Sequence, residues 1–276
     1  MSKSPRSGGE VLIDGLIRFG AKRLFCVPGE SYLAALDALH DRAEKIDVIT
    51  CRQEGGASYM AEAHGKLTGI PGICFVSRGP GASNAMTGIH TAFQDSTPML
   101  LFIGQVSRAD VGREAFQELN FSKVFGSVVK KVIRIDHAQR IPELLAQAWN
   151  SAVGGRPGPV VVELPEDMLK DMVCVDDALL SDTPLPAPDP KSMARLVSLL
   201  EEADNPVLIV GGAGWTPGAS AALHQFADTQ NLPVATSFRR CDSFDNTHPK
   251  YIGELGLAPN PKLVERIKLQ RGKHVL

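Results

Sequence analysis

The chain has 276 residues, a length that suits one large domain or two ordinary ones. Hydrophobic residues make up 43% of it and charged residues 22%, so it can bury a core and is not a disordered chain. The formal net charge of −2 gives no reason to expect a nucleic acid or a membrane surface as partner. We expect no secretory signal and no membrane span, because the first ten residues are polar and the longest apolar stretch is short.

Strands and helices alternate through the first part of the sequence. Predicted strands are continuous apolar runs, as in parallel sheets that helices cover on both faces, and this order favours a doubly wound α/β sheet. The predicted strands are Arg23–Val27, Asp47–Thr50, Gly72–Ser77, Pro98–Gly104 and Pro159–Glu163. The predicted helices are Glu10–Phe19, Tyr32–Leu39, Gly55–Leu67, about Ala82–Phe93, and Ile141–Val153.

A segment rich in proline and aspartate, residues 176–191, predicts a solvated linker between two domains, residues 1–175 and 192–276. The second domain repeats the α/β order, but two or three strand–helix units make it thin, and we expect it to be cut short. Its predicted elements are the helices Ser192–Ala203, Ala219–Thr229 and Lys262–Lys268, the strands Pro206–Val210 and Leu232–Thr236, and the turn Gly211–Gly214.

Chemistry-bearing segments follow the predicted strands of the first domain, at the sheet edge where ligands bind in open α/β folds. They are VPGES at 27–31, RQEGGAS at 52–58, SRGPGASN at 77–84 and AFQE at 115–118. Glu54 is the leading candidate, because a helix N-terminus favours its anion while burial by a partner would raise its pKa. The alternative is a charge that merely complements the helix dipole.

The glycine-rich segments leave several readings open. SRGPGASN could cradle phosphate, pack against a flat ring, or form an ordinary tight connection, and it matches neither standard nucleotide motif. GGAGWTPG at 211–218 is more typical of a structural turn than of a dinucleotide site.

Cysteines and histidines give little support for other chemistry. The odd number of cysteines and the absence of metal-ligand spacing favour reduced thiols in the cytoplasm and no metal site. A Cys/His hydrolase built on Cys51 is the weakest enzyme alternative. The cysteines are Cys26, Cys51, Cys74, Cys174 and Cys241.

Seven elements occur in one order: FCVPGE, RQEGGASYMAEAHGKLTG, SRGPGASN, AFQDSTPML, IGQV, AFQE and GRPGPVVVELPEDM. Together they resemble the N-terminal half of thiamine-diphosphate-dependent enzymes of the acetolactate synthase, pyruvate oxidase and pyruvate decarboxylase group. The match covers roughly Gly9 to Met168, continues more weakly beyond, and is closest to acetolactate synthase-like large subunits.

The resemblance implies a flavodoxin-like pyrimidine-binding domain followed by a partial Rossmann-like central domain. It also implies a homodimer or homotetramer, with thiamine diphosphate held between the pyrimidine domain of one subunit and the diphosphate domain of another. Glu54 matches the catalytic glutamate of the family. The resemblance implies that its carboxyl group hydrogen-bonds a ring nitrogen of the cofactor's aminopyrimidine and so favours the imino tautomer. The imino nitrogen then takes the proton from the thiazolium carbon.

Further site residues carry over from the same resemblance. Gln117 matches a catalytic glutamine near the reacting centre, and Phe116 beside it is a substrate-side aromatic residue. The remaining cofactor-binding positions are Val27, Pro28, Gly29, Glu30, Pro80 and Asn84. AFQDSTPML and the helix that begins at Gly55 match dimer-contact regions.

Two departures from the family affect the expected outcome. Glu30 stands where the synthases usually carry a small residue, and its carboxylate could donate a proton or restrict a second keto acid. We also expect the C-terminal domain that holds magnesium and the diphosphate in the family to be absent from this chain, and we interpret the chain as truncated. FAD, which some relatives bind in the central domain, is possible but unsupported here.

The leading hypothesis is an N-terminal part of an enzyme that decarboxylates a 2-keto acid such as pyruvate and joins the product to an acceptor, as in acetolactate formation. Alone, the chain is expected to be inactive. The alternatives are a 2-keto acid decarboxylase without carboligation, and a non-catalytic dimerisation or binding module.

Overall fold

A computed structural model describes residues 4–177, 179–180, 184 and 186–269. The chain forms two compact units, unit 1 (residues 1–184) and unit 2 (residues 185–276). In the described part of the chain, every helix is too short or too polar to cross a membrane.

Unit 1 is built on one parallel sheet with strand order β3-β2-β4-β5-β7-β6. Every residue of the central strands β4, β5 and β7 is buried, as the continuous apolar runs predict. The strands are β2 (Arg23–Cys26), β3 (Asp47–Thr50), β4 (Gly72–Val76), β5 (Met99–Gln105), β6 (Lys131–Arg134) and β7 (Pro159–Pro165).

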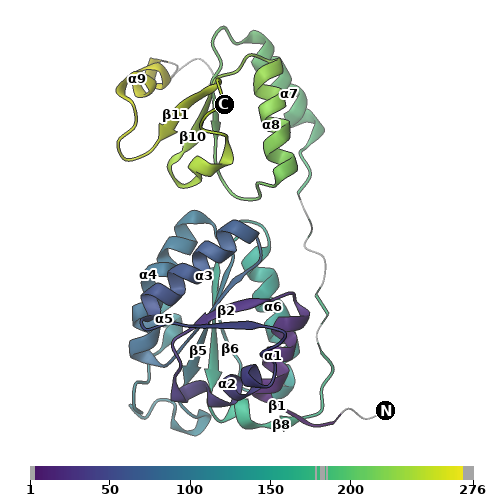
Figure 1. Cartoon of the computed structure of the whole chain (residues 1–276), viewed down its shortest axis with the longest axis vertical. Coiled ribbons are helices and arrows are strands. Elements are labelled where there is room, and N and C mark those ends of the chain that lie inside the picture. The colour runs from purple at the N-terminus through teal and green to yellow at the C-terminus, as the bar shows by residue number, and fades with distance from the viewer. Residues whose placement is uncertain (1–3, 178, 181–183, 185, 270–276) are drawn as a thin grey trace. The chain divides into compact units, whose positions relative to one another are not determined.

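Helices cover both faces of this sheet (Figure 1). One core cluster lies between the sheet and α1, α2 and α6, and the second lies between the sheet and α3, α4 and α5. This confirms the doubly wound, flavodoxin-like prediction. The helices are α1 (Gly8–Arg18), α2 (Leu33–His40), α3 (Glu54–Thr68), α4 (Gly79–Asp95), α5 (Phe121–Phe125) and α6 (Ile141–Val153), with a short 3₁₀ turn η1 (Glu30–Tyr32) before α2.

The start of α4 differs from the sequence prediction. Gly79, Pro80 and Gly81 form its first turn instead of a glycine-rich connection before it. Proline is tolerated there because the first helical N–H groups need no partner within the helix. The helix therefore begins immediately after Arg78, at the carboxyl end of β4.

Strand β6 and helix α5 of unit 1 were not predicted, because they lack long apolar runs. Strand β6 is an edge strand that starts and ends with the charged residues Lys131 and Arg134. Helix α5 has five residues, of which Phe121 and Phe125 are buried. A two-stranded antiparallel sheet, β1 (Arg6–Ser7) with β8 (Met172–Val173), completes the unit.

Unit 2 has a three-stranded parallel sheet in the order β11-β10-β9, which confirms the partial Rossmann-like α/β prediction. Its elements are α7 (Pro190–Glu202), β9 (Leu208–Val210), α8 (Pro217–Thr229), β10 (Val234–Ser237), β11 (Tyr251–Leu255) and α9 (Pro261–Leu269), with a 3₁₀ segment η5 (Phe238–Ser243). Strand β11 was not predicted, because Gly253 and Glu254 interrupt its apolar residues.

Candidate functional site

The carboxyl ends of β2 and β4 form the topological switch point of unit 1, where connections leave the sheet in opposite directions. The loop after β2 packs directly on the loop after β4. The Oγ atoms of Ser31 and Ser77 are 3.0 Å apart, and a Cβ on Gly29 would lie 2.7 Å from that of Ser77. The Tyr32 hydroxyl donates to the Val27 carbonyl at 2.5 Å, and burial raises the pKa of Tyr32 so that it stays a donor.

Glu54 is the first residue of α3, next to an N-cap formed by the Gln53 side chain, which accepts from the Gly56 N–H. Asn84 of α4 donates its amide to Glu54 Oε2 at 2.9 Å. A Cβ on Gly81 would lie 3.4 Å from Glu54 Oε1, so glycine leaves room beside the second carboxylate oxygen. The carboxyl group is half-buried and oriented, and a ring nitrogen is a chemically suitable partner for it.

Gln117 is joined to the same edge through its backbone. It adopts a left-handed conformation with φ of 64°, and its carbonyl accepts from the Gly79 N–H at 2.9 Å. A Cβ on Gly79 would lie 2.8 Å from that carbonyl, so only glycine allows this approach. Pro80 is exposed beside it, and the neighbouring Phe116 side chain is 72% exposed.

The structure thus brings together segments that lie far apart in the sequence. Hydrogen bonds and close backbone approaches join the segments of this edge, which carry Val27, Gly29, Glu30, Glu54, Asn84 and Gln117. Pro28, Pro80 and Phe116 lie at the solvent-exposed border of this edge. The expected convergence of the four segments is therefore present in the geometry.

Arg78 is a residue of this edge that the sequence interpretation missed. It is 7% exposed, and its guanidinium donates to Glu30 Oε1 at 3.1 Å and to Glu166, which follows β7. Its Nε is buried and has no hydrogen-bond partner among the described residues. The sequence carried a signal for this role, because Arg78 stands between a buried strand and the glycines that follow it. An arginine buried at such a position needs acidic partners.

The thiols near the switch point are not activated nucleophiles. Burial raises the pKa of Cys26 to about 11 and also raises the pKa values of Cys51 and Cys74. A protonated thiol is a poor nucleophile, which disfavours the hydrolase alternative built on Cys51. In the described residues, no group of three or more His, Cys, Asp or Glu side chains is arranged to hold a metal ion.

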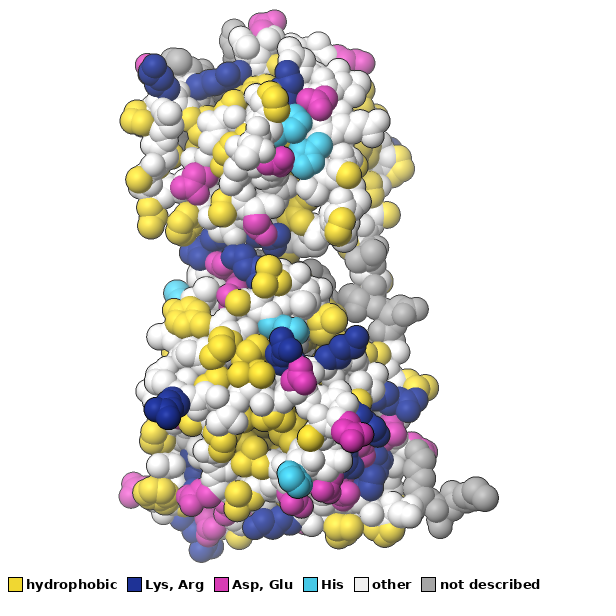
Figure 2. All heavy atoms as spheres, in the orientation of Figure 1, with side chains coloured by type: hydrophobic (Ala, Val, Ile, Leu, Met, Phe, Trp, Pro, Cys, Tyr) yellow, Lys and Arg dark blue, Asp and Glu magenta, His cyan; other side chains and the backbone are white. Residues whose placement is uncertain are grey.

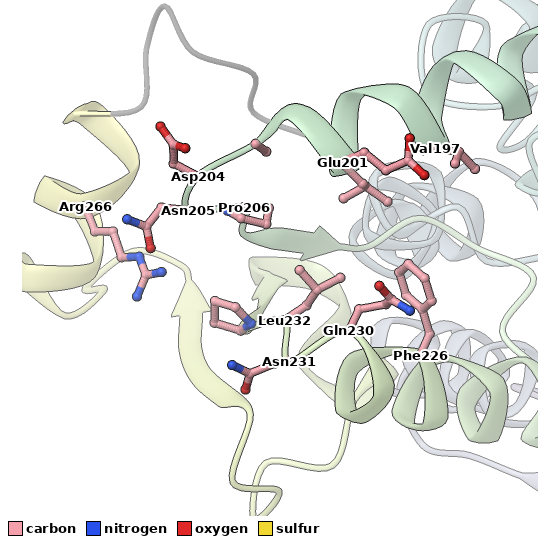
Figure 3. Close-up of a pocket in the computed structure, with 13 residues that line it drawn as sticks. Val197, Glu201, Asp204, Asn205, Pro206, Phe226, Gln230, Asn231, Leu232 and Arg266 are labelled. Carbon is pink, nitrogen blue, oxygen red and sulfur yellow. The ribbon is translucent and has the colours of Figure 1, made fainter.

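A pocket of about 700 Å³ lies in unit 2, at the amino ends of β9 and β10 (Figure 3). Apolar side chains such as Phe226 and Leu232 share it with Arg266, Asn205 and Gln230. It includes none of the sequence-predicted site residues and lies at the opposite end of the strands from the usual ligand edge.

Unit 1 also exposes apolar side chains on and beside α3. Figure 2 shows hydrophobic side chains gathered on the face of unit 1 toward the viewer. The large exposed hydrophobic residues of α3 are Tyr59 at 47%, Met60 at 41% and Leu67 at 86%. Exposed apolar patches are typical of protein–protein contacts.

Comparison with known proteins places both units in one family. Residues 6–124 match the thiamine pyrophosphate enzyme N-terminal TPP binding domain, and residues 193–269 match the thiamine pyrophosphate enzyme central domain. The chain is 36% identical over 257 residues to the acetolactate synthase isozyme 3 large subunit of Escherichia coli (strain K12), covering 91% of the chain and 45% of that protein.

Other relatives agree with this match. The acetolactate synthase of Arthrospira platensis is 32% identical over 259 residues, which cover 91% of this chain and 45% of that protein. The probable acetolactate synthase large subunit of Methanocaldococcus jannaschii is 32% identical over 257 residues, which cover 91% of this chain and 43% of that protein. The chain spans a little under half the length of these relatives. With matched N-terminal and central domains on an α/β fold of the expected kind, the chain belongs to the thiamine pyrophosphate enzyme family.

Proposed function

We propose that the chain supplies the pyrimidine side of a thiamine-diphosphate site in an enzyme that acts on a 2-keto acid, with pyruvate as the expected substrate and acetolactate as the expected product. The observation that carries the proposal is the Glu54–Asn84 pair, with a 2.9 Å hydrogen bond. It stands beside the space left by Gly81, at the sheet edge where ligands bind. Residues 1–175 are assigned to the pyrimidine-binding domain and residues 192–276 to part of a central domain, with 176–191 between them.

The residues at this edge suit the aminopyrimidine part of the cofactor. When bound, thiamine diphosphate supplies a carbon nucleophile and a sink for the electrons released by decarboxylation. Glu54 would hold or release a proton at a ring nitrogen, and Asn84 would keep its carboxyl group oriented. Gln117 would present its side chain to the reacting centre from its left-handed turn. Val27, Pro28, Gly29 and Pro80 would line the ring.

Among the described residues, His, Cys, Asp and Glu side chains do not gather in a group that could hold Mg²⁺. We assign the binding of Mg²⁺ and of the diphosphate to a C-terminal diphosphate-binding domain, and we do not assign FAD to the central domain. We expect the site to be shared in a homodimer or homotetramer, and the exposed Tyr59, Met60 and Leu67 on α3 support a contact between subunits. The chain alone is expected to be inactive.

Glu54→Gln tests the proposal. The chain is fused to the region of the Escherichia coli relative that follows its matched half, and pyruvate consumption is measured with thiamine diphosphate and Mg²⁺. Glu54→Gln should lower turnover at least about tenfold, equivalent to about 1.4 kcal/mol in the barrier. The exposed Glu44→Gln is the control and should match the unmodified protein. Unchanged turnover in Glu54→Gln would remove Glu54 from the catalytic role.

The placement of Glu30 favours an alternative reaction, decarboxylation of the keto acid without carboligation. Its carboxylate is 68% exposed and is fixed by Arg78, so a negative charge stands at the same edge as Glu54. A fixed anion there would repel a second anionic keto acid and favour simple decarboxylation. The ratio of acetaldehyde to acetolactate formed by the fusion distinguishes the outcomes, and Glu30→Gln should lower that ratio. Absence of both products, together with no rise in melting temperature on adding cofactor and Mg²⁺, would favour a non-catalytic binding module.

A further inference from the structure

The turn that carries Gln117 has an unusual backbone. Both Glu114 and Gln117 have positive φ, 54° and 64°, although neither is glycine. Side-chain-bearing residues adopt this conformation at a cost, and it persists where the surroundings hold it. Two carbonyls of the turn are held from outside. That of Gln117 accepts from the Gly79 N–H, and that of Leu119 accepts from the Gln105 side chain, both at 2.9 Å.

Gln105 is the last residue of β5 and is 2% exposed. Its Oε1 accepts from the Val106 N–H at 2.9 Å, which fixes the orientation of the amide. Its Nε2 donates to the Leu119 carbonyl at 2.9 Å, and the Gln105 side chain lowers the pKa of the buried Glu163 carboxyl group on the neighbouring strand β7, opposing the effect of burial. The side chain therefore accepts one hydrogen bond and donates another at once, a combination that a neutral amide provides and that an ionised glutamate or a methionine does not.

The Glu118 side chain holds the N-terminal part of the same turn. The Glu118 carboxylate accepts from the Gly112 N–H at 2.7 Å and from the Ala115 N–H at 3.2 Å. Those bonds stay within the loop, whereas the Gln105 bond ties the loop to the sheet. Because Gln105 is rigid and buried, its bond fixes where the turn stands relative to the carboxyl ends of the strands.

We propose that Gln105 is a positioning residue that anchors the 115–119 turn to β5 and so sets the place of Gln117 at the sheet edge. The anchoring depends on the structure of unit 1 alone. Its catalytic consequence rests on the proposed function, so the two are tested separately.

Hydrogen exchange on the 276-residue chain tests the anchoring. The Gly79 amide, bonded to the Gln117 carbonyl, should exchange at least about tenfold faster in Gln105→Met, while Leu101 within β5 keeps its protection. The exposed Gln139→Met is the matched control. Exchange at Gly79 within twofold of the unmodified chain would overturn the proposal. If Gln105→Met does not fold, Gln105→Glu keeps the shape and the acceptor but removes the amide N–H group that donates to the Leu119 carbonyl. The same exchange rates at Gly79 then support or overturn the proposal.

Kinetics on the fusion protein test the consequence for catalysis. Gln105→Glu should lower kcat by about tenfold with KM for pyruvate within twofold, because misplacement of a catalytic group slows the chemical step. In a Gln117→Ala background, adding Gln105→Glu should lower kcat little further, since both changes remove the contribution of the Gln117 side chain. Fully additive losses would overturn the positioning role even with faster exchange at Gly79. Faster exchange with no pyruvate turnover in any fusion would leave the anchoring intact and refute the proposed function.

Discussion

The two units use the same strand–helix repeat but bury it to different degrees. In unit 1 every residue of β4, β5 and β7 is buried, and α1 contributes seven buried residues. In unit 2, β9 and β11 are only half-buried, and none of the residues of α7 is buried. On α7, Met193 and Val197 remain 43% and 50% exposed. Apolar spacing therefore determines which face of a helix can be buried, and the number of packed neighbours determines whether it is buried.

The largest expected difference in stability is between truncations of one phenylalanine from each unit. Phe102 is fully buried and stacks on Phe75 with ring centroids 4.6 Å apart, whereas Phe226 on α8 is 39% exposed. Phe102→Ala should destabilise unit 1 by roughly 3–5 kcal/mol, because it leaves a cavity in a closed core. Phe226→Ala should cost unit 2 less than about 1 kcal/mol. Denaturant unfolding measures both, and equal losses would contradict the contrast between the units.

Local sequence patterns predicted the bounds of several elements of unit 1 closely, including those of β3, an edge strand without a buried residue. The bounds of β3 and α6 were predicted to the residue, and β4, β5 and β7 within two residues, because apolar runs and helix caps are local signals. The convergence of Glu54, Asn84 and Gln117 on one edge followed from their places after parallel strands. The partners of Arg78 could not be predicted, because Glu30 and Glu166 lie 48 and 88 residues away. Long-range pairing of this kind depends on strand order.

The buried Glu163 carboxyl group should make the stability of unit 1 depend on pH. Burial raises its pKa to about 7 from 4.5, although Arg134 stands 3.7 Å away. The folded state therefore binds this proton more tightly than the unfolded state. Its contribution to stability is fully present below pH 4.5 and is lost as pH rises to about 7, a change of roughly 3 kcal/mol.

Glu163→Gln removes this titration. The variant should be more stable than the unmodified chain at pH 8 and nearly equal at pH 4, as measured by denaturant unfolding across the pH range. The exposed Glu201→Gln of unit 2 is the control and should leave the pH profile unchanged. A constant difference between Glu163→Gln and the unmodified chain at every pH would show that packing, not proton binding, governs this position.

The smallest expected losses of stability come from removing an arginine from its ion pairs, in unit 1 and in unit 2. Arg78 joins loops after three strands, whereas Arg240 pairs with Asp242 two residues away at 3.1 Å, an aspartate whose side chain is 54% exposed. Arg78→Met should cost about 2 kcal/mol, less than for a fully buried pair, because Glu30 and Glu166 are partly solvated. Arg240→Met should cost less than about 1 kcal/mol, as for an exposed local pair.

The cause of the Arg78 loss can be separated from simple loss of packing. Arg78→Met leaves the Glu30 and Glu166 carboxylates near each other without the cation that holds them. Adding Glu30→Gln and Glu166→Gln removes that repulsion, so the triple variant should regain most of the lost free energy of unfolding. High salt should narrow the gap between Arg78→Met and the triple variant. If the triple variant is no more stable than Arg78→Met, Arg78 acts through the packing of its aliphatic stem, and the carboxylates tolerate its absence.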